Sequence, residues 1–154
     1  VCCVAIVGRA NNPLYIKAFD GDFKALQLAV YTSLDVCDEL CECVCVAAYE
    51  AVCACVCVGL TPSAPTTATD AFLGLLCPVE DLLVYGYATN TRTKIIVAVR
   101  DAFAKDEAGL RGLMAKLHTL YVDAVCNPFS VIDERITSVR FDSAVADAVS
   151  AFSR

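Results

Sequence analysis

Residues 72–99 read FLGLLCPVEDLLVYGYATNTRTKIIVAV, three apolar runs separated by turn residues. The runs at 72–77, 82–88 and 94–99 are rich in leucine, isoleucine, valine and tyrosine, a composition that favours strands. The intervening segments contain proline, aspartate, asparagine and threonine, which favour turns. Three adjacent strands with short connections predict an antiparallel meander.

Two further strands are predicted before the meander. Residues 2–7 (CCVAIV) and 14–19 (LYIKAF) are apolar runs, and the segment between them contains the turn residues Asn11, Asn12 and Pro13. This pattern predicts a β-hairpin. The period then changes to a helical one, which predicts a helix from about residue 22 to at least residue 41 with Asp22 as its N-cap. Its apolar stripe is Leu26, Val30, Leu34 and Cys37.

Two helices are predicted after the meander. The first covers about 106–126 and ends before Pro128, which cannot continue a helix. Its apolar stripe is Leu110, Leu113, Leu117, Tyr121 and Val125. The second has Phe141, Val145, Ala148 and Phe152 at the same period. The predicted order is β-β-α-β-β-β-α-α, a five-stranded antiparallel sheet with helices on both faces. We expect one α+β domain over residues 1–154.

Composition excludes several functions. The chain carries a formal charge of −6, and its 12 Lys and Arg residues are scattered, so nucleic acid and anionic membrane surfaces are not expected partners. The sequence contains neither a GxGxxG nor a GxxxxGK[ST] motif. We expect no cofactor and no metal site, and we expect an intracellular protein.

Residues 41–58 read CECVCVAAYEAVCACVCV, with six cysteines at Cys-x-Cys spacing. One interpretation is a thiol-rich metal site centred on Cys41–Cys57, since thiolates bind Zn²⁺ and Cu⁺. A membrane span is a second, although Glu50 lies near the centre of the apolar stretch. A third is a GT-rich DNA repeat, because alternating GTG and TGT codons read Val and Cys. With the low-complexity stretch that follows, we expect an insert at about residues 41–71.

Candidate site residues are few. Asp35, Asp38 and Glu39 have i, i+3, i+4 spacing on the predicted helix and are predicted to share one face. Such a cluster suits partner binding, although a solvated acidic face, acid–base chemistry and metal binding are alternatives. The single histidine, His118, is predicted to be an ordinary packed or partly exposed helix residue. We predict that the chain is not an enzyme.

Five blocks of the sequence resemble the sedlin family. They read NNPLYIKAF, YTSLDVCDEL, FLGLLCPVEDLLVYGYATNTRTKIIVAV, MAKLHTLYVDAVCNPF and ITSVRFDSAV, and they occur in the family's order. The resemblance covers most of the chain outside residues 41–71, where this sequence is longer than the family pattern. It implies a longin-like (SNARE-like) fold, which matches the predicted element order.

The resemblance also implies a function. Sedlin-family proteins are non-catalytic adaptors of the transport protein particle (TRAPP) vesicle-tethering complex, which acts in ER-to-Golgi and Golgi transport and promotes nucleotide exchange on a Rab GTPase. It implies other TRAPP subunits as partners and a cytoplasmic protein that meets membranes only peripherally, through the complex. Asp35 matches the aspartate of the family's SLDV-x-DE motif, and Asn127, Pro128 and Phe129 match its NPF block. For the NPF block we expect a role in the fold. The alternative to a TRAPP subunit is another longin-fold trafficking adaptor with different partners.

Overall fold

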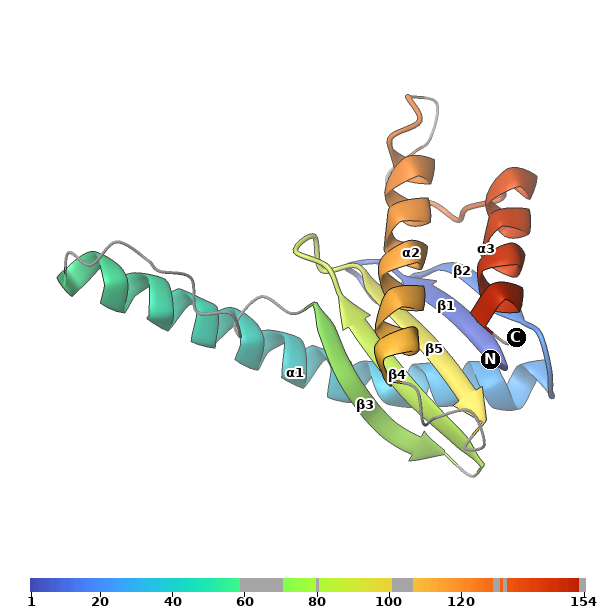
Figure 1. The fold of residues 1–154 in the computed structure, drawn as a ribbon, viewed down its shortest axis with the longest axis horizontal. Helices are drawn as coiled ribbons and strands as arrows, with labels where there is room; N and C mark the ends of the chain where they lie inside the picture. The colour runs from blue at the N-terminus through green and yellow to red at the C-terminus, as the bar shows by residue number, and fades with distance from the viewer. Residues whose placement is uncertain (59–70, 80, 101–106, 129–130, 132, 153–154) are drawn as a thin grey trace.

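A computed structural model describes residues 1–58, 71–79, 81–100, 107–128, 131 and 133–152, with the backbone alone for 41–58. Its elements follow the predicted order (Figure 1). The strands are β1 (Cys3–Val7), β2 (Pro13–Ala18), β3 (Phe72–Val79), β4 (Leu82–Ala88) and β5 (Lys94–Arg100). The helices are α1 (Phe23–Val58), α2 (Glu107–Val125) and α3 (Val139–Phe152).

The five strands form one antiparallel sheet in the order β2-β1-β5-β4-β3. The meander β3-β4-β5 supplies one half, and the hairpin β1-β2 joins it through β1 and β5, whose register pairs Ala5 with Ile96. This central pair is buried on both sides, which explains why β1 and β5 read as continuous apolar runs. The edge strand β3 contains two register shifts and a positive-φ glycine, Gly74.

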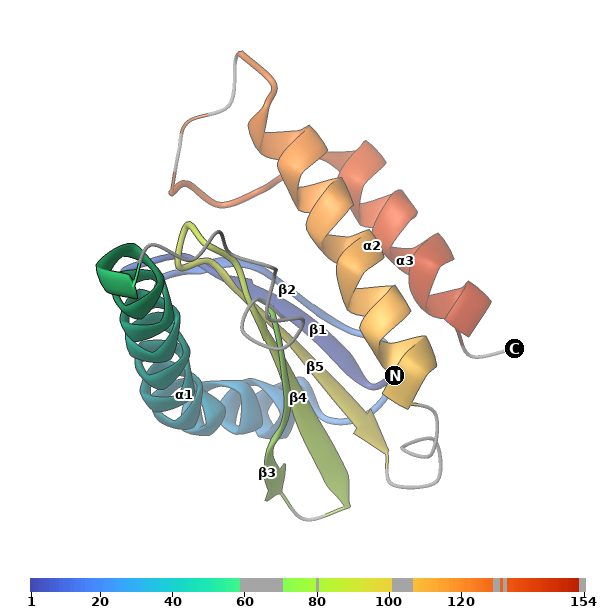
Figure 2. The ribbon, with the colours of Figure 1, turned by 60° about the vertical axis from the view of Figure 1, so that its left-hand side comes forward.

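Helices cover both faces of the sheet (Figure 2). One apolar cluster joins alternate residues of β1 and β5, such as Val4 and Val97, to the buried stripes of α2 and α3. The cluster on the opposite face joins residues such as Ala5 and Ile96 to α1. The period-2 alternation of the strands therefore divides the core into two layers.

Helix α1 begins and continues as its sequence dictates. Asp22 is the N-cap, because its Oδ1 accepts a hydrogen bond of 3.1 Å from the Lys24 backbone N–H. The segment 23–58 contains neither glycine nor proline, and α1 runs its whole length. The first half of α1 lies on the sheet, whereas the second half extends well past it (Figure 1).

Helices α2 and α3 pack side by side on the other face. The α2 helix ends at Val125, just before Pro128. Ser138 caps α3, since its Oγ accepts a hydrogen bond from the Phe141 N–H at 3.5 Å. In the first turn of α3, Asp142 accepts hydrogen bonds of 2.7 Å each from Tyr15 and Lys17 of β2. These contacts attach α3 to the edge of the sheet.

The structure confirms the α+β fold, the element order and the placement of helices on both faces. The first helix, predicted to reach at least residue 41, continues to Val58, because neither glycine nor proline interrupts it. One bound differs from that predicted. Pro78, predicted to begin a turn, lies within β3; an edge strand tolerates proline because one row of its N–H groups has no ladder partner. The part of the predicted insert at 59–70 lies outside the described residues.

Candidate interface on helix α1

The first half of α1 has an inner face and an outer face. Its inner residues pack on the sheet and are almost fully buried: Leu26, Ala29, Val30, Ser33, Leu34 and Cys37. Because an α-helix repeats every 3.6 residues, residues that fall between these positions face away from the sheet. The outer face of α1 in this half is therefore a candidate surface for partners.

Two of the three predicted site residues lie on this outer face. Asp35 and Glu39 are exposed one helical turn apart. Two large apolar side chains lie on the same side of the helix: Leu28, which is 67% exposed, and Tyr31, which is 37% exposed. Leu28 and Tyr31 precede Asp35 by seven and four residues, so all three share one face. The outer face thus combines exposed apolar area with two carboxylates.

Asp38 is placed differently. Its carboxylate forms an ion pair with Lys94 at the start of β5 and accepts a hydrogen bond of 3.1 Å from the Asn11 side-chain amide. Burial alone would raise the Asp38 pKa, but the hydrogen bonds from Lys94 and Asn11 outweigh it and hold the pKa below its ordinary value. The predicted acidic face therefore divides, with Asp38 turned to the sheet and Asp35 and Glu39 turned to solvent.

Sequence reasoning missed three residues of this region. Leu28 and Tyr31 are apolar residues that do not belong to the i, i+4 stripe of Leu26, Val30 and Leu34, and this mismatch was an available signal. Lys94 begins an otherwise apolar run and is buried, and a buried lysine is usually paired with an acidic group. Its partners, however, are distant in the sequence and could not be named without the fold.

The cysteine-rich segment is helical in α1. Within the side chains that the structure describes, no group of three or more potential ligands gathers. Of the cysteines whose side chains are described, Cys2, Cys3 and Cys37 are buried, Cys77 is half-buried and Cys126 is exposed. In the described part of the chain, no helix is both long and apolar enough to cross a membrane.

His118 is a packed residue, as predicted. Its ring lies 5.5 Å from the ring of Tyr87, measured between centroids, and its Nδ1 is 3.4 Å from the Tyr87 hydroxyl. The contact joins α2 to β4 across the helix–sheet interface.

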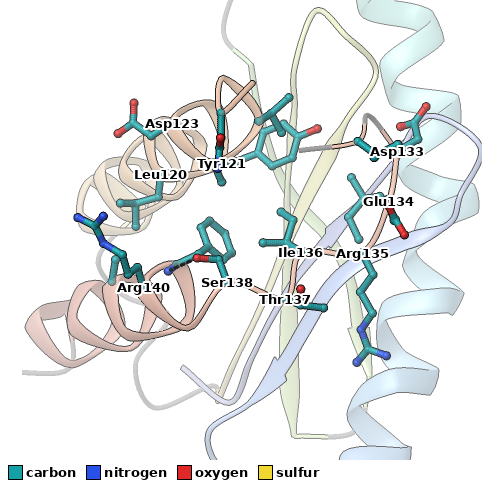
Figure 3. A pocket seen from close by; sticks show the side chains of 17 residues that line it. Leu120, Tyr121, Asp123, Asp133, Glu134, Arg135, Ile136, Thr137, Ser138 and Arg140 are labelled. Carbon is teal, nitrogen blue, oxygen red and sulfur yellow. Dashed lines mark hydrogen bonds between the residues drawn. The ribbon is translucent and has the colours of Figure 1, made fainter. Parts of the chain in front are cut away.

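A groove of about 780 Å³ lies between the end of α2, the segment before α3 and the first turns of α3. Figure 3 shows Leu120 and Ile136 directed toward it, whereas Asp123 and Arg135 point away. Of the NPF block, Asn127 belongs to the lining of this groove. The side chains of Asn127 and Pro128 are exposed, and Phe129 lies outside the described residues. Both apolar and charged side chains line the groove.

Comparison with known proteins identifies the family. A family model described as Sedlin matches residues 6–151. The chain is 34% identical over 146 residues to "Trafficking protein particle complex subunit 2-like protein" of Bos taurus, covering 93% of this chain and 92% of the relative. It is 32% identical over 154 residues to the protein of the same name from Dictyostelium discoideum, covering 97% and 96%. These matches confirm the resemblance seen in the five sequence blocks, and the chain belongs to the Sedlin family.

Proposed function

We propose that this chain is a non-catalytic adaptor subunit of the TRAPP complex, in which it holds neighbouring subunits together. The complex as a whole acts in ER-to-Golgi and Golgi vesicle transport and promotes nucleotide exchange on a Rab GTPase. The chain itself is cytoplasmic and reaches membranes peripherally, through the complex. It folds as one domain over residues 1–154.

The observation that carries this proposal is the outer face of α1. Leu28 and Tyr31 expose large apolar side chains beside the carboxylates of Asp35 and Glu39. A face of this kind matches the composition of protein interfaces, where buried apolar anchors are surrounded by polar and charged groups. The names of the relatives support the type of partner, since they describe subunits of the trafficking protein particle complex.

The chemistry of the outer face specifies the partner surface. Asp35 and Glu39 require cationic side chains opposite them, and the net charge of −6 also favours a basic partner. Leu28 and Tyr31 require apolar contact area. We therefore expect a neighbouring subunit whose surface carries lysine or arginine at the edge of an apolar patch.

Co-expression of the tagged chain with the other TRAPP subunits tests the proposal. Purification through the tag followed by quantitative mass spectrometry should recover the subunits at a fixed whole-number ratio to the chain. The purified complex should promote nucleotide exchange on its Rab, whereas the isolated chain should not. Assembly of the other subunits into a complete complex that excludes the chain would disprove the adaptor role.

The thiol-rich metal-binding alternative is tested on the same material. Protein produced in zinc-replete medium should contain substoichiometric metal if the chain is an adaptor. A fixed whole number of ions per chain, together with loss of helical circular dichroism on chelation, would instead establish a metal site at Cys41–Cys57.

A further inference from the structure

Lys94 is the most deeply buried charged side chain among the described residues. Only 3% of its side chain is exposed, although it begins the central strand β5. Its ammonium donates a hydrogen bond of 2.5 Å to Asn11 Oδ1 and pairs with the carboxylate of Asp38. Asn11 in turn donates to the other carboxylate oxygen of Asp38 at 3.1 Å. The three side chains thus form a closed triad.

The triad joins three separate parts of the fold. Asn11 lies in the turn of the β1–β2 hairpin, Lys94 at the start of β5, and Asp38 on α1. Asn11 has a φ of 59°, a left-handed conformation that asparagine tolerates better than most residues. The turn therefore places the Asn11 amide where it meets both charged partners.

Asp38 is the last point at which a described side chain of α1 is held by the sheet. Cys37 beside it is buried, whereas Glu39 and Leu40 are exposed and α1 then extends past the sheet (Figure 1). Apolar packing by Leu34 and Cys37 tolerates small rotations, because it is not directional. An ion pair with hydrogen bonds is directional, so the triad fixes the angle of α1 about its own axis.

We propose that Lys94, Asn11 and Asp38 are positioning residues for the α1 interface: they set the rotation of α1 so that Asp35 and Glu39 face the partner, and Asp38 does not contact the partner itself. This inference rests on the proposed function of the outer face. Asp38, predicted from the sequence to contact the partner, would instead hold α1 on the sheet. Lys94 would affect assembly although it is buried and does not touch the partner.

Four chains test the proposal: the wild type, Asp38→Asn, Lys94→Met and the double variant. Each is measured for its melting temperature and for recovery of co-expressed TRAPP subunits. Asp38→Asn leaves the buried Lys94 charge without its counter-ion and should lower the melting temperature by about 5 °C or more. Lys94→Met should cost less, since 43% of the Asp38 side chain is exposed to water. Both single variants should reduce subunit recovery at least threefold.

The double variant distinguishes positioning from a purely structural role. It removes both charges with little change in shape, and a neutral replacement of a buried ion pair is often tolerated. If the triad sets the rotation of α1, the double variant should regain the melting temperature but recover subunits as poorly as Asp38→Asn, because the directional contact is still absent. Regained stability with recovery within about twofold of the wild type would show that the triad matters only for folding, and would overturn the proposal.

A double-mutant cycle between Asp35 and Asp38 separates positioning from contact even if the double variant stays unstable. If Asp38 acts through the placement of Asp35 and Glu39, Asp38→Asn should weaken binding by a smaller factor in the Asp35→Asn chain than in the wild type. Losses that multiply would indicate two independent contacts and contradict the proposal.

Asp142→Asn is the matched control, because Asp142 forms an ion pair with Lys17 on the opposite side of the sheet. It should lower the melting temperature without lowering subunit recovery. Recovery that falls in step with stability in this control would mean that Asp38 and Lys94 matter only for folding. A wild-type chain that recovers no subunits would instead disprove the proposed function itself.

Discussion

Tyr15 donates a 2.7 Å hydrogen bond to Asp142, which joins the edge strand β2 to the first turn of α3. Lys17 binds the other carboxylate oxygen at the same distance. Hydrogen bonds from Lys17 and Tyr15 hold the Asp142 pKa below its ordinary value of 3.8. A carboxylate with a lowered pKa stabilises the fold above its unfolded pKa, and this contribution is lost as the pH falls.

We therefore predict that the difference in unfolding free energy between the wild type and Asp142→Asn is largest above about pH 4 and shrinks as the solution becomes more acidic. Urea denaturation across this range measures it. Tyr15→Phe should cost about 1 kcal/mol near neutral pH, because it removes one hydrogen bond to a charged acceptor that water can then solvate. A difference between the wild type and Asp142→Asn that stays constant down to about pH 2 would contradict the role of Asp142.

Two glycine-to-alanine substitutions should change stability in opposite directions. A Cβ at Gly8 would overlap the Asn12 side-chain oxygen, and the Asn12 amide is held in place because it donates to the Asp133 carbonyl at 2.9 Å. Gly8→Ala should therefore destabilise by about 1–3 kcal/mol through overpacking. Gly112 lies inside α2 with open space around it, so Gly112→Ala should stabilise by about 0.5–1 kcal/mol. Chemical denaturation measures the unfolding free energy of both variants. A change of the same sign in both would contradict the different surroundings of the two glycines.

Thiol reactivity should follow burial. Desolvation by burial, reinforced by neighbouring Cys2, raises the pKa of Cys3 to about 12, whereas Cys126 is exposed. Because the thiolate is the reactive form, native protein at about pH 8 should alkylate at Cys126 long before Cys3. Peptide mass spectrometry after a short iodoacetamide pulse measures the order. Equal labelling in native protein would show that β1 opens to solvent, and equal labelling in urea is the control.

Most of the fold was predictable because its elements carry distinct periods. The strands β1, β4 and β5 are short apolar runs bounded by turn residues, and α2 and α3 have unbroken stripes with a proline or a cap at their ends. The end of α1 was not predicted, because valine and cysteine have modest helix propensities and gave residues 41–58 no clear helical stripe. Only the absence of glycine and proline up to residue 58 indicated continuation.

The candidate interface was predictable only in part. Motif matching directed attention to Asp35, Asp38 and Glu39, but spacing alone could not separate the two outward carboxylates from the one held by the sheet. Asp38 differs because α1 crosses the sheet next to Lys94 and the Asn11 turn, which are distant in sequence. Such pairings depend on tertiary packing, which local periodicity does not encode.

Leu28 should contribute to partner binding and not to folding. With 67% of its surface exposed, replacement by serine removes little buried area, so the melting temperature should change by less than about 2 °C. If Leu28 is an apolar anchor of the interface, Leu28→Ser should weaken subunit binding by about tenfold. Val131, in the segment before α3, is equally exposed, and Val131→Ser is the control, with no expected loss.

Charge reversal at Asp35 tests the α1 interface most directly. Asp35→Lys is compared with Asp147→Lys, which reverses another exposed carboxylate, on α3. Both chains should melt within about 2 °C of the wild type, because neither residue is buried. Asp35→Lys should recover co-expressed TRAPP subunits at least tenfold less well, through repulsion of cationic partner groups, and Asp147→Lys should recover them normally. Wild-type recovery by Asp35→Lys would contradict an interface on the outer face of α1.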